Sequence, residues 1–282
     1  MSCIIVVPVY KETLNEYEKI SIIQLDKVLK NYPIALVHFP ELNIKNVISL
    51  FQHNHNIFSV TFPKQYFKSP QTYNRLLTSL KFFKDFGKYD FFLMYHTDAY
   101  VFKDELEYWC NKDYDYIGAP IYEYNGTINP PDENYICVGN GGFSLHKVDS
   151  AIKVLKTLRK IYPIKDLVKW YYKYNWKGRI KYLPYFLRVL LGFGGNSHHL
   201  LNYIRINEDI FWGKYVPEAF QDFKVAPFEE ASKFGMEYNC EKLLKLNNYR
   251  LPFGCHQWFK REFLNFWKPY INEQVNPIKS HE

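Results

Sequence analysis

The sequence predicts an α/β fold built around a largely parallel β-sheet, and three observations support this prediction. The chain has 282 residues, the length of one large domain. Its composition is globular, with 47% hydrophobic and 23% charged residues, which excludes a disordered chain, a collagen and a coiled coil. Through the first 120 residues, short β-branched apolar runs alternate with segments of helical spacing.

The first half of the chain alternates strands and helices. We expect buried strands at Cys3–Val9, Ile34–Phe39, Ile57–Val60 and Asp90–His96. Helices are expected between them, at Leu14–Leu29, at Asn43–Phe51, and from the N-cap Ser69 to about Phe86. Because ligands of parallel sheets lie at the carboxyl ends of the strands, a site is expected after Val9, Val60 and Tyr95.

The second half of the chain is less regular. The elements expected there are strands at Asp115–Pro120 and Tyr135–His146, helices at Val148–Ile161 and Asn207–Tyr215, a strand near Phe223–Ala226 and a helical tail at Trp258–Tyr270. Five cysteines without a Cys-x-x-Cys pair predict reduced thiols. No charged region precedes the apolar N-terminal run, and Pro8 interrupts it, so we expect a cytoplasmic protein without a signal peptide.

Charge and aromatic content are the unusual features of the composition. Thirty-six Lys and Arg against 29 Asp and Glu leave +7, which predicts an anionic partner such as nucleotide phosphate, nucleic acid or a membrane surface. Residues 161–205 contain eight basic residues and one acid, so the whole excess lies in this segment. The chain is 19% aromatic, more than one core can hold, so many rings are expected at surfaces or in clefts.

Four short motifs carry candidate chemistry, and each has two interpretations. Asp98, in a His-Thr-Asp segment at a strand end, either caps a turn or holds Mg²⁺ or Mn²⁺ against a diphosphate. The segment Gly139–Gly142 either forms a tight hairpin turn or lets the backbone approach a ligand. Glu208 and Asp209 either complement a helix dipole or supply a general base. His256, after a glycine turn, is either structural or a metal ligand.

In this order the four motifs resemble the core of GT-A glycosyltransferases, and the glycine and Asn-Glu-Asp segments are similar to those of β-1,4-galactosyltransferases. Over about residues 3–160 and 205–260, the chain resembles more closely a little-characterised bacterial GT-A family of surface-polysaccharide glycosyltransferases. The matching segments are Pro8–Lys11, Tyr73-Asn74, Thr97–Phe102, Asp115–Pro120, Val138–Leu145, Asn207–Asp209 and Phe253–His256. One position departs from the pattern, because the first acid of the metal motif is His96 here, and its role stays open.

The resemblance implies one GT-A domain in three parts. Residues 1–160 would form the nucleotide-sugar-binding core, 161–206 a basic aromatic helical insertion, and 207–282 the part with the catalytic base, the metal histidine and an aromatic tail. Asp98 and His256 would bind Mn²⁺ or Mg²⁺. The residues expected to bind the nucleotide-sugar are Pro8, Val9, Tyr10, Lys11, Asn74, Arg75, His96, Thr97, Asp98, Asn140, Gly141 and Gly142. Tyr10 either stacks on uracil or only packs.

The implied reaction is inverting transfer of a hexose from a nucleotide-sugar, with UDP-galactose or UDP-glucose as the expected donor. Asp209 would take the proton of the acceptor hydroxyl, and Glu208 would hold donor or acceptor hydroxyls. The expected acceptor is a glycan or a lipid-linked oligosaccharide of capsule or lipopolysaccharide synthesis. Three alternatives are a metal-dependent nucleotidyltransferase, a non-catalytic carbohydrate-binding protein and a nucleic-acid-binding protein. The last leaves the Asn-Glu-Asp and glycine segments unexplained, so no nucleic-acid partner is expected.

The basic segment also has two interpretations. Five lysines recur at every fourth residue from Lys165 to Lys181, which makes them neighbours on a helix surface. They form either a solvated helical face or part of an amphipathic insertion. In the second case, residues 162–205 would lie on the inner face of the cytoplasmic membrane and bring the site to a lipid-linked acceptor. The sequence does not decide between the two, nor does it give the oligomeric state.

Overall fold

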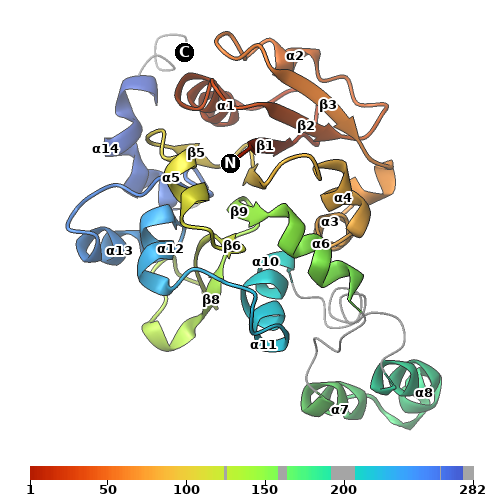
Figure 1. Ribbon diagram of the computed structural model, residues 1–282. Helices are drawn as coiled ribbons and strands as arrows, with labels where there is room; N and C mark the ends of the chain where they lie inside the picture. The colour runs from red at the N-terminus through yellow and green to blue at the C-terminus, as the bar shows by residue number, and fades with distance from the viewer. Residues whose placement is uncertain (124–125, 158–163, 192–206, 261, 276–282) are drawn as a thin grey trace.

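A six-stranded sheet with strand order β3-β2-β1-β4-β9-β6 forms the centre of the molecule (Figure 1). The computed structural model describes residues 1–123, 126–157, 164–191, 207–260 and 262–275. The strands of the sheet are β1 (Cys3–Pro8), β2 (Ile34–His38), β3 (Ile57–Thr61), β4 (Phe91–Tyr95), β6 (Tyr116–Ile117) and β9 (Phe143–Lys147). The first four strands pair in parallel, and β9 runs antiparallel to β4 and β6. The predicted α/β fold class is confirmed.

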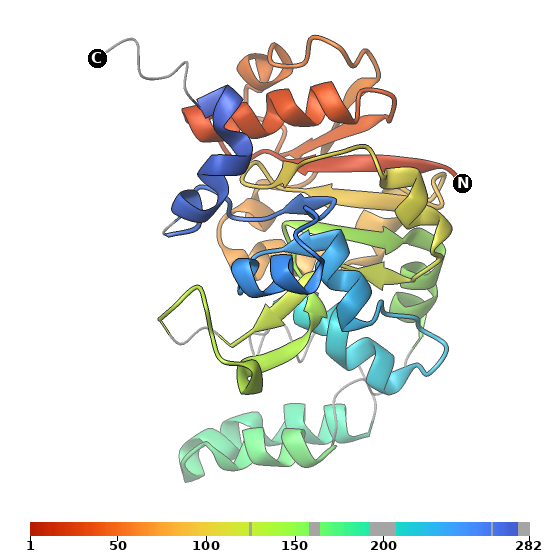
Figure 2. The ribbon, with the colours of Figure 1, turned by 90° about the vertical axis from the view of Figure 1, so that its left-hand side faces the viewer.

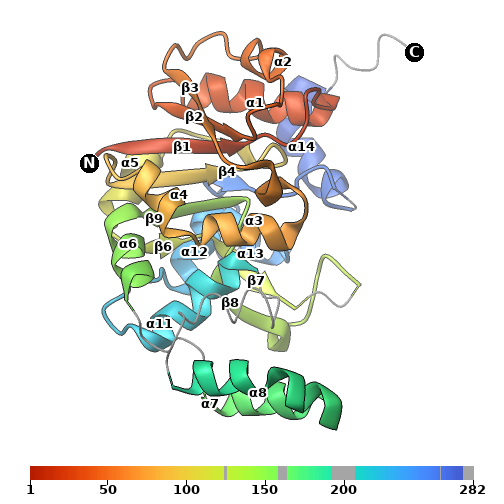
Figure 3. The ribbon, with the colours of Figure 1, turned by 90° about the vertical axis from the view of Figure 1, so that its right-hand side faces the viewer.

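Helices cover both faces of this sheet, as the opposite views in Figures 2 and 3 show. Ile5 and Val7 point to the face covered by α1 (Glu16–Val28), α2 (Lys45–Ile48), α5 (Leu106–Asn111) and α12 (Phe228–Phe234). Ile4 and Val6 point to the face covered by α3 (Pro70–Leu77), α4 (Leu80–Asp85) and α6 (Val148–Lys156). Because both faces are buried, the strands are continuous apolar runs rather than alternating ones.

The second half of the chain adds two smaller sheets. A three-stranded sheet joins β10 (Gly235–Met236), β11 (Gly254–Cys255) and β5 (Tyr100–Val101), and an antiparallel ribbon joins β7 (Ala119–Tyr122) to β8 (Tyr135–Gly139). The remaining elements are η1 (Lys64–Phe67), η2 (Asp132–Asn134), α7 (Ile164–Tyr172), α8 (Trp176–Leu190), α10 (Glu208–Ile210), the π-helical turn η4 (Phe211–Tyr215), α11 (Val216–Ala219), α13 (Cys240–Leu246) and α14 (Phe263–Val275).

The aromatic side chains are distributed among three hydrophobic clusters. One cluster lies on each face of the large sheet, and the third lies between the small three-stranded sheet, α13 and α14. The largest fully buried side chains are all aromatic, and four of the six tryptophans are among them, namely Trp109, Trp212, Trp258 and Trp267. Rings also lie at surfaces or in the cavity described below, as expected, with Tyr108, Tyr172, Trp176 and Tyr249 each at least half exposed. Most tryptophans are nevertheless buried, because three clusters hold what a single core cannot.

Several expected elements differ in the structure. The helix expected to reach Phe86 is interrupted at Thr78, whose hydroxyl donates to the Asn74 carbonyl, and restarts at Ser79, whose hydroxyl accepts from the Phe82 amide. Such local side-chain bonds compete with helix continuation. The strand expected near Phe223–Ala226 is reduced to one bridge, between Tyr116 and Val225. The C-terminal helix begins at Phe263.

The strands expected at Asp115–Pro120 and Tyr135–His146 are each divided in two, into β6 and β7 and into β8 and β9. The helix expected at Asn43–Phe51 is shortened to α2, and the one expected at Asn207–Tyr215 becomes α10 and the π-helical turn η4. The division into three parts stays a prediction. Of the helix expected at Val148–Ile161, residues 148–156 are helical, and 158–161 lie outside the described residues. The expected insertion at 161–206 contains α7 and α8, and its residues 161–163 and 192–206 also lie outside the described part. All five cysteines are buried and free of disulfides, as expected for reduced thiols.

Candidate active site

A cavity of about 710 Å³ opens at the carboxyl ends of β1 and β4, where the sequence predicted a site. Its lining combines segments far apart in the chain. They include Tyr10 after β1, Asn74 on α3, His96 after β4, residues 140–142 between β8 and β9, Glu208 and Asp209 on α10, Glu237 after β10 and His256 after β11. All four sequence motifs therefore meet at one place.

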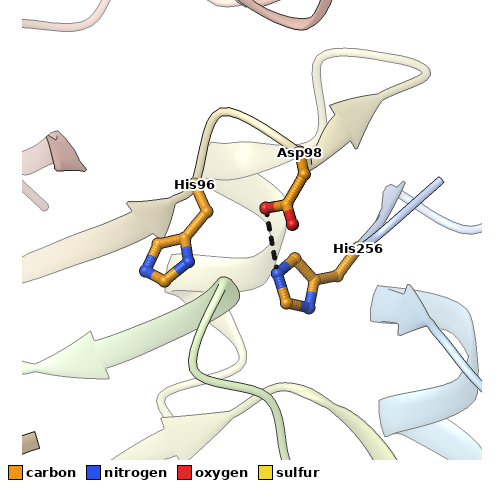
Figure 4. A group of neighbouring side chains, drawn as sticks. All are labelled: His96, Asp98 and His256. Atoms are coloured by element: carbon orange, nitrogen blue, oxygen red, sulfur yellow. Dashed lines mark ion pairs between the residues drawn. The ribbon is translucent and has the colours of Figure 1, made fainter. Parts of the chain in front are cut away.

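His96, Asp98 and His256 form a compact cluster beside the cavity (Figure 4). One donor atom from each lies within 4.8 Å of the other two. His96 and Asp98 belong to the turn between β4 and β5, whereas His256 follows β11. The antiparallel pairing of β11 with β5 brings the two segments together. Asp98 Oδ1 lies 3.1 Å from His256 Nε2.

The electrostatic surroundings keep Asp98 ionised. Burial opposes its charge, but His256, His96 and Lys260 together hold the pKa of the Asp98 carboxyl well below its usual range. Burial also opposes the charge of His256, yet Asp98 and Glu237 on either side raise its pKa to about 10. Burial lowers the pKa of His96 to about 3, so this imidazole is neutral at physiological pH. A buried carboxylate thus lies between two imidazoles, one of them neutral.

These residues fit a divalent cation. Two imidazoles and a carboxylate suit a first-row transition ion better than Mg²⁺. His256 Nε2 is buried without a hydrogen bond, and its approach to Asp98 is that of an ion pair. Tyr73 Oη lies 3.2 Å from His96 Nε2, which leaves the other ring nitrogen of His96 for a ligand role. A Cβ at Gly142 would lie 1.9 Å from His256 Nε2, so only glycine leaves this nitrogen accessible.

Two adjacent carboxylates, Glu208 and Asp209, also line the cavity. Burial and then the charge of Asp209 raise the pKa of Glu208 to about 8. Burial raises the pKa of Asp209 to about 6, against the opposing amides of Ile210 and Gly141. The Gly141 amide donates to Asp209 Oδ2 at 3.2 Å. Near neutral pH, Asp209 is ionised and Glu208 is protonated, which gives the two carboxyl groups different chemical roles.

The glycine segment is not a hairpin turn, so that interpretation is wrong. β8 pairs with β7, whereas β9 pairs with β4 and β6. Positive φ within the segment is found at Asn140 (121°), whose Oδ1 accepts from the Gly142 and Phe143 amides at 3.0 and 3.1 Å. The glycines instead provide space, since a Cβ at Gly141 would lie 2.2 Å from Glu208 Oε1.

Sequence reasoning missed Glu237, which connects two parts of the site. Its Oε2 accepts from Asn140 Nδ2 at 2.7 Å and lies 3.1 Å from His256 Nδ1, and its Oε1 accepts from Gln257 Nε2 at 2.7 Å. Glu237 therefore orients both the glycine segment and the metal histidine. Lys260, which pairs with Asp98, was also missed. Neither residue belongs to a motif, and the pairing of β10 with β11 that places Glu237 was not predicted.

Some of the predicted binding residues do not line the cavity. Pro8 and Val9 are buried in the core, where the Val9 amide donates to the Val37 carbonyl at 2.8 Å. Lys11 and Thr97 both contact Glu18 instead, as an ion pair at 2.7 Å and a hydrogen bond at 3.3 Å.

On α3, Asn74 and Arg75 have different surroundings. Asn74 lines the cavity and donates from Nδ2 to Asn207 Oδ1 at 3.2 Å. Arg75 is exposed and lies outside the lining, because consecutive helical residues point about 100° apart. Its expected role in binding the nucleotide-sugar stays a prediction.

The family model described as "Protein of unknown function (DUF5672)" matches residues 56–256. The chain belongs to the DUF5672 family. The matched part of this DUF5672 protein contains His96, Asp98 and His256, the glycine segment and both cavity carboxylates, and it begins after Tyr10. No curated protein matches the sequence significantly.

Several solved glycosyltransferase structures are similar to the DUF5672 chain. A galactosyltransferase, LgtC, in complex with donor and acceptor sugar analogues, is 12% identical, with 99% of this chain and 97% of that chain covered and a TM-score of 0.48. Core-mannan synthase A from Aspergillus fumigatus is 12% identical over 81% and 73%, with a TM-score of 0.48. Mouse xyloside xylosyltransferase 1 is 9% identical over 90% and 96%, with a TM-score of 0.46. All three TM-scores are below 0.5, so these similarities do not indicate the activity of this chain.

Proposed function

We propose that this DUF5672 protein is a metal-dependent glycosyltransferase, which moves a sugar from a nucleotide-sugar to a hydroxyl group of a glycan or lipid-linked acceptor. One observation carries the proposal. The cavity has a cluster of metal ligands at one wall and a pair of carboxylates with separated pKa values at another, with glycine residues crowded against both. Glycosyl transfer needs these two functions side by side, charge neutralisation for the leaving group and a base for the acceptor.

His96, Asp98 and His256 would hold the divalent cation. Bound there, a cation supplies charge neutralisation for the leaving nucleoside diphosphate. Glu237 holds His256 through Nδ1, so that Nε2 is directed at Asp98 and the cavity. The two imidazole donors favour a first-row transition ion over Mg²⁺, and among these ions we infer Mn²⁺ from the resemblance of the motifs.

Asp209 is the proposed general base. It is ionised near neutral pH, lines the cavity and is positioned by the Gly141 amide. The acceptor hydroxyl would transfer its proton to an Asp209 carboxylate oxygen as it attacks the anomeric carbon. Protonated Glu208 can donate a hydrogen bond to a sugar hydroxyl. A base opposite the leaving group predicts inversion at the anomeric carbon.

Tyr10 is the proposed platform for the nucleotide base. Its side chain is 40% exposed and lines the cavity, while the ring packs edge to face on Tyr73 and Phe67 at 5.5 and 6.0 Å. A partly exposed ring held by aromatic neighbours suits stacking on a base. UDP-hexose as donor and a surface-polysaccharide acceptor rest on the resemblance of the motifs. A cytoplasmic location stays a prediction.

The test is a screen of nucleotide-sugars with Mn²⁺ that measures release of nucleoside diphosphate, with Asp209→Asn as the decisive variant. We expect Asp209→Asn to lower turnover roughly 10²- to 10⁴-fold, the usual contribution of a general base. Thermal shift by Mn²⁺ and donor should persist in the variant, and the exposed Asp222→Asn is the matched control. Near-normal transfer by Asp209→Asn would exclude this base, and no response to any nucleotide-sugar would overturn the function.

The products separate this proposal from its alternatives. A nucleotidyltransferase with the same cation site would release pyrophosphate instead of a nucleoside diphosphate. The set of two histidines and one carboxylate is also used by non-haem iron oxygenases. Oxygen consumption with Fe²⁺, without nucleoside diphosphate release with Mn²⁺, would favour that chemistry over glycosyl transfer.

A further inference from the structure

α7 and α8 pack on each other as a hairpin that lies beside the main body of the molecule (Figures 2 and 3). The contact between them is aromatic. Trp170 packs against Tyr182 at 5.8 Å, and Tyr171 stacks on Phe186 at 4.3 Å. Asn175 begins α8 by accepting from the Gly178 amide at 2.9 Å. The turn interrupts the lysine spacing, so one continuous lysine face is not formed.

The side of α8 that faces away from this aromatic contact is apolar and exposed. Five large side chains there are between 42% and 68% exposed, namely Trp176, Ile180, Leu183, Leu187 and Leu191. Their spacing of three and four residues places them within roughly 80° of the helix circumference, at about 100° per residue. We call these five residues the α8 stripe. Several large apolar side chains exposed side by side usually mark an interaction site.

The charges around the α8 stripe have one sign. α8 contains four basic residues, Lys177, Arg179, Lys181 and Arg188, and no acid. Three of them, Lys177, Lys181 and Arg188, flank the stripe on the same side at about 100° per residue. Lys177 lies over the Trp176 ring, with Nζ 5.5 Å from the centroid. An apolar band with basic residues beside it matches an interface that is apolar inside and negatively charged outside.

We propose that the α8 stripe and its basic flank dock on the surface of an anionic phospholipid bilayer. The apolar side chains enter the boundary between headgroups and acyl chains, Trp176 takes the interfacial position that indole rings favour, and the basic side chains contact lipid phosphates. In the described residues, no helix combines the length and the apolarity that crossing a membrane requires.

The position of the hairpin gives this docking a consequence for the cavity. In Figures 2 and 3, the turn between α7 and α8 lies on the same side of the molecule as the carboxyl ends of β1 and β4. The cavity opens at those strand ends. Docking through α8 would therefore hold the cavity near the bilayer, where a lipid-linked acceptor is presented. The docking itself does not depend on the proposed function.

Trp176 provides a direct probe of this contact. It is 66% exposed, whereas the other five tryptophans are at most 6% exposed, so acrylamide quenches Trp176 first. We expect phosphatidylcholine vesicles that contain phosphatidylglycerol to shift its emission to the blue and to protect it from quenching. Pure phosphatidylcholine vesicles and high salt should reduce both effects. Unchanged emission and quenching with phosphatidylglycerol vesicles at low salt would overturn the proposal.

Matched variants test the two components of the surface by vesicle co-sedimentation. Ile180→Glu, and separately Lys177→Glu with Lys181→Glu, should each lower the vesicle-bound to free ratio at least tenfold. Ile23→Glu is the control, because Ile23 is 43% exposed on α1, and it should bind as the unmodified protein does. Unchanged melting temperatures would show that every variant is folded.

Two further outcomes would reject the bilayer as the occupant. Binding that Ile180→Glu leaves unchanged would show that the α8 stripe is not the contact. A dimer in sedimentation velocity that Ile180→Glu dissociates, without vesicle binding, would identify a second copy of the chain as the occupant. None of these measurements requires sugar transfer, so failure here leaves the proposed activity untouched.

Discussion

The cavity and the α7–α8 hairpin depart from the usual distribution of side chains in opposite ways. The cavity buries Asp98, Glu208 and His256, although charged groups are rarely buried without partners. The hairpin exposes Trp176 and Ile180, which usually lie inside. In the cavity, the fold supplies the partners, since Asp98 and Glu237 flank His256. Within the described residues, the α8 stripe leaves its apolar surface exposed, and the fold supplies no such partner for it there.

Removing a tryptophan should cost much more stability in the buried core of the main body than on the hairpin. Trp212 is fully buried and packs against Phe83 at 5.2 Å, so Trp212→Ala should lower the free energy of unfolding by about 3–5 kcal/mol. Trp176→Ala removes an exposed ring and should change it by less than about 0.5 kcal/mol. Urea denaturation of both variants measures the difference. A large loss for Trp176→Ala would show that the hairpin buries this ring.

The close packing of glycine against the metal histidine predicts a steric effect confined to the cavity. Gly142→Ala places a Cβ 1.9 Å from His256 Nε2, so we expect a loss of about 1–3 kcal/mol in unfolding free energy together with weaker Mn²⁺ binding. At Gly235 the nearest atom to an added Cβ is 3.4 Å away, so Gly235→Ala is the matched control. Calorimetric titration with Mn²⁺ distinguishes the two. Equal Mn²⁺ affinity in both variants would argue against His256 as a ligand.

Glu237 tests whether the cavity is organised by its internal partners. Glu237→Gln keeps the shape of the side chain but removes the charge that faces His256 and Asn140. We expect Mn²⁺ affinity to fall roughly tenfold to a hundredfold, the usual cost of losing the partner of a ligating histidine. The exposed Lys177→Gln on α8 should leave Mn²⁺ affinity unchanged. An unaltered affinity in Glu237→Gln would assign Glu237 a purely structural role.

The buried carboxylates predict that stability falls as pH rises. Burial raises the pKa of Glu208 to about 8, above its value in an unfolded chain, so the folded state binds more protons until pH passes 8. Between about pH 7 and 8, where His96 is mostly neutral in both states, unfolding free energy should fall by up to about 1.4 kcal/mol per pH unit for this group.

Glu208→Gln should flatten this pH dependence. The variant removes the titrating group, while the raised pKa of His256 leaves a residual decline of the same sign. Urea denaturation across this pH range, with a chelator present, measures both slopes. Equal slopes for the variant and the unmodified protein would contradict the ionisation assigned to Glu208.

Local pattern predicted the elements with strong periodicity. The runs at β1, β2 and β4 are apolar because both faces of the sheet are covered there, whereas the edge strand β3 is partly exposed. The Ser69 N-cap with Pro70 marked the start of α3 correctly. The break between α3 and α4 was not predicted, because it depends on single side-chain hydrogen bonds of Thr78 and Ser79. Prediction also failed for two-residue strands such as β10 and β11, which have no periodicity of their own and exist only through pairing.

For the candidate site, residues within short motifs were predicted and residues outside them were missed. Asp98, Asp209 and His256 were identified because each lies in a short motif, and the structure brings all three to the cavity region. Glu237 and Lys260 have no motif, so only their contacts with His256 and Asp98 identify them. Asn74 and Arg75 were predicted together, but adjacent residues on a helix face different directions, and of the two only Asn74 lines the cavity.

The sequence by itself determined the α/β class, the residue types of the cation site and the location of the net charge in 161–205. These follow from composition, hydrophobic period and motif order, which are local properties. The tertiary structure decided that β11 pairs with β5, that Glu237 lies between Asn140 and His256, and that the apolar side of α8 faces solvent. The physical reason is that burial and ion pairing depend on which elements pack together, and this cannot be read from a local sequence pattern.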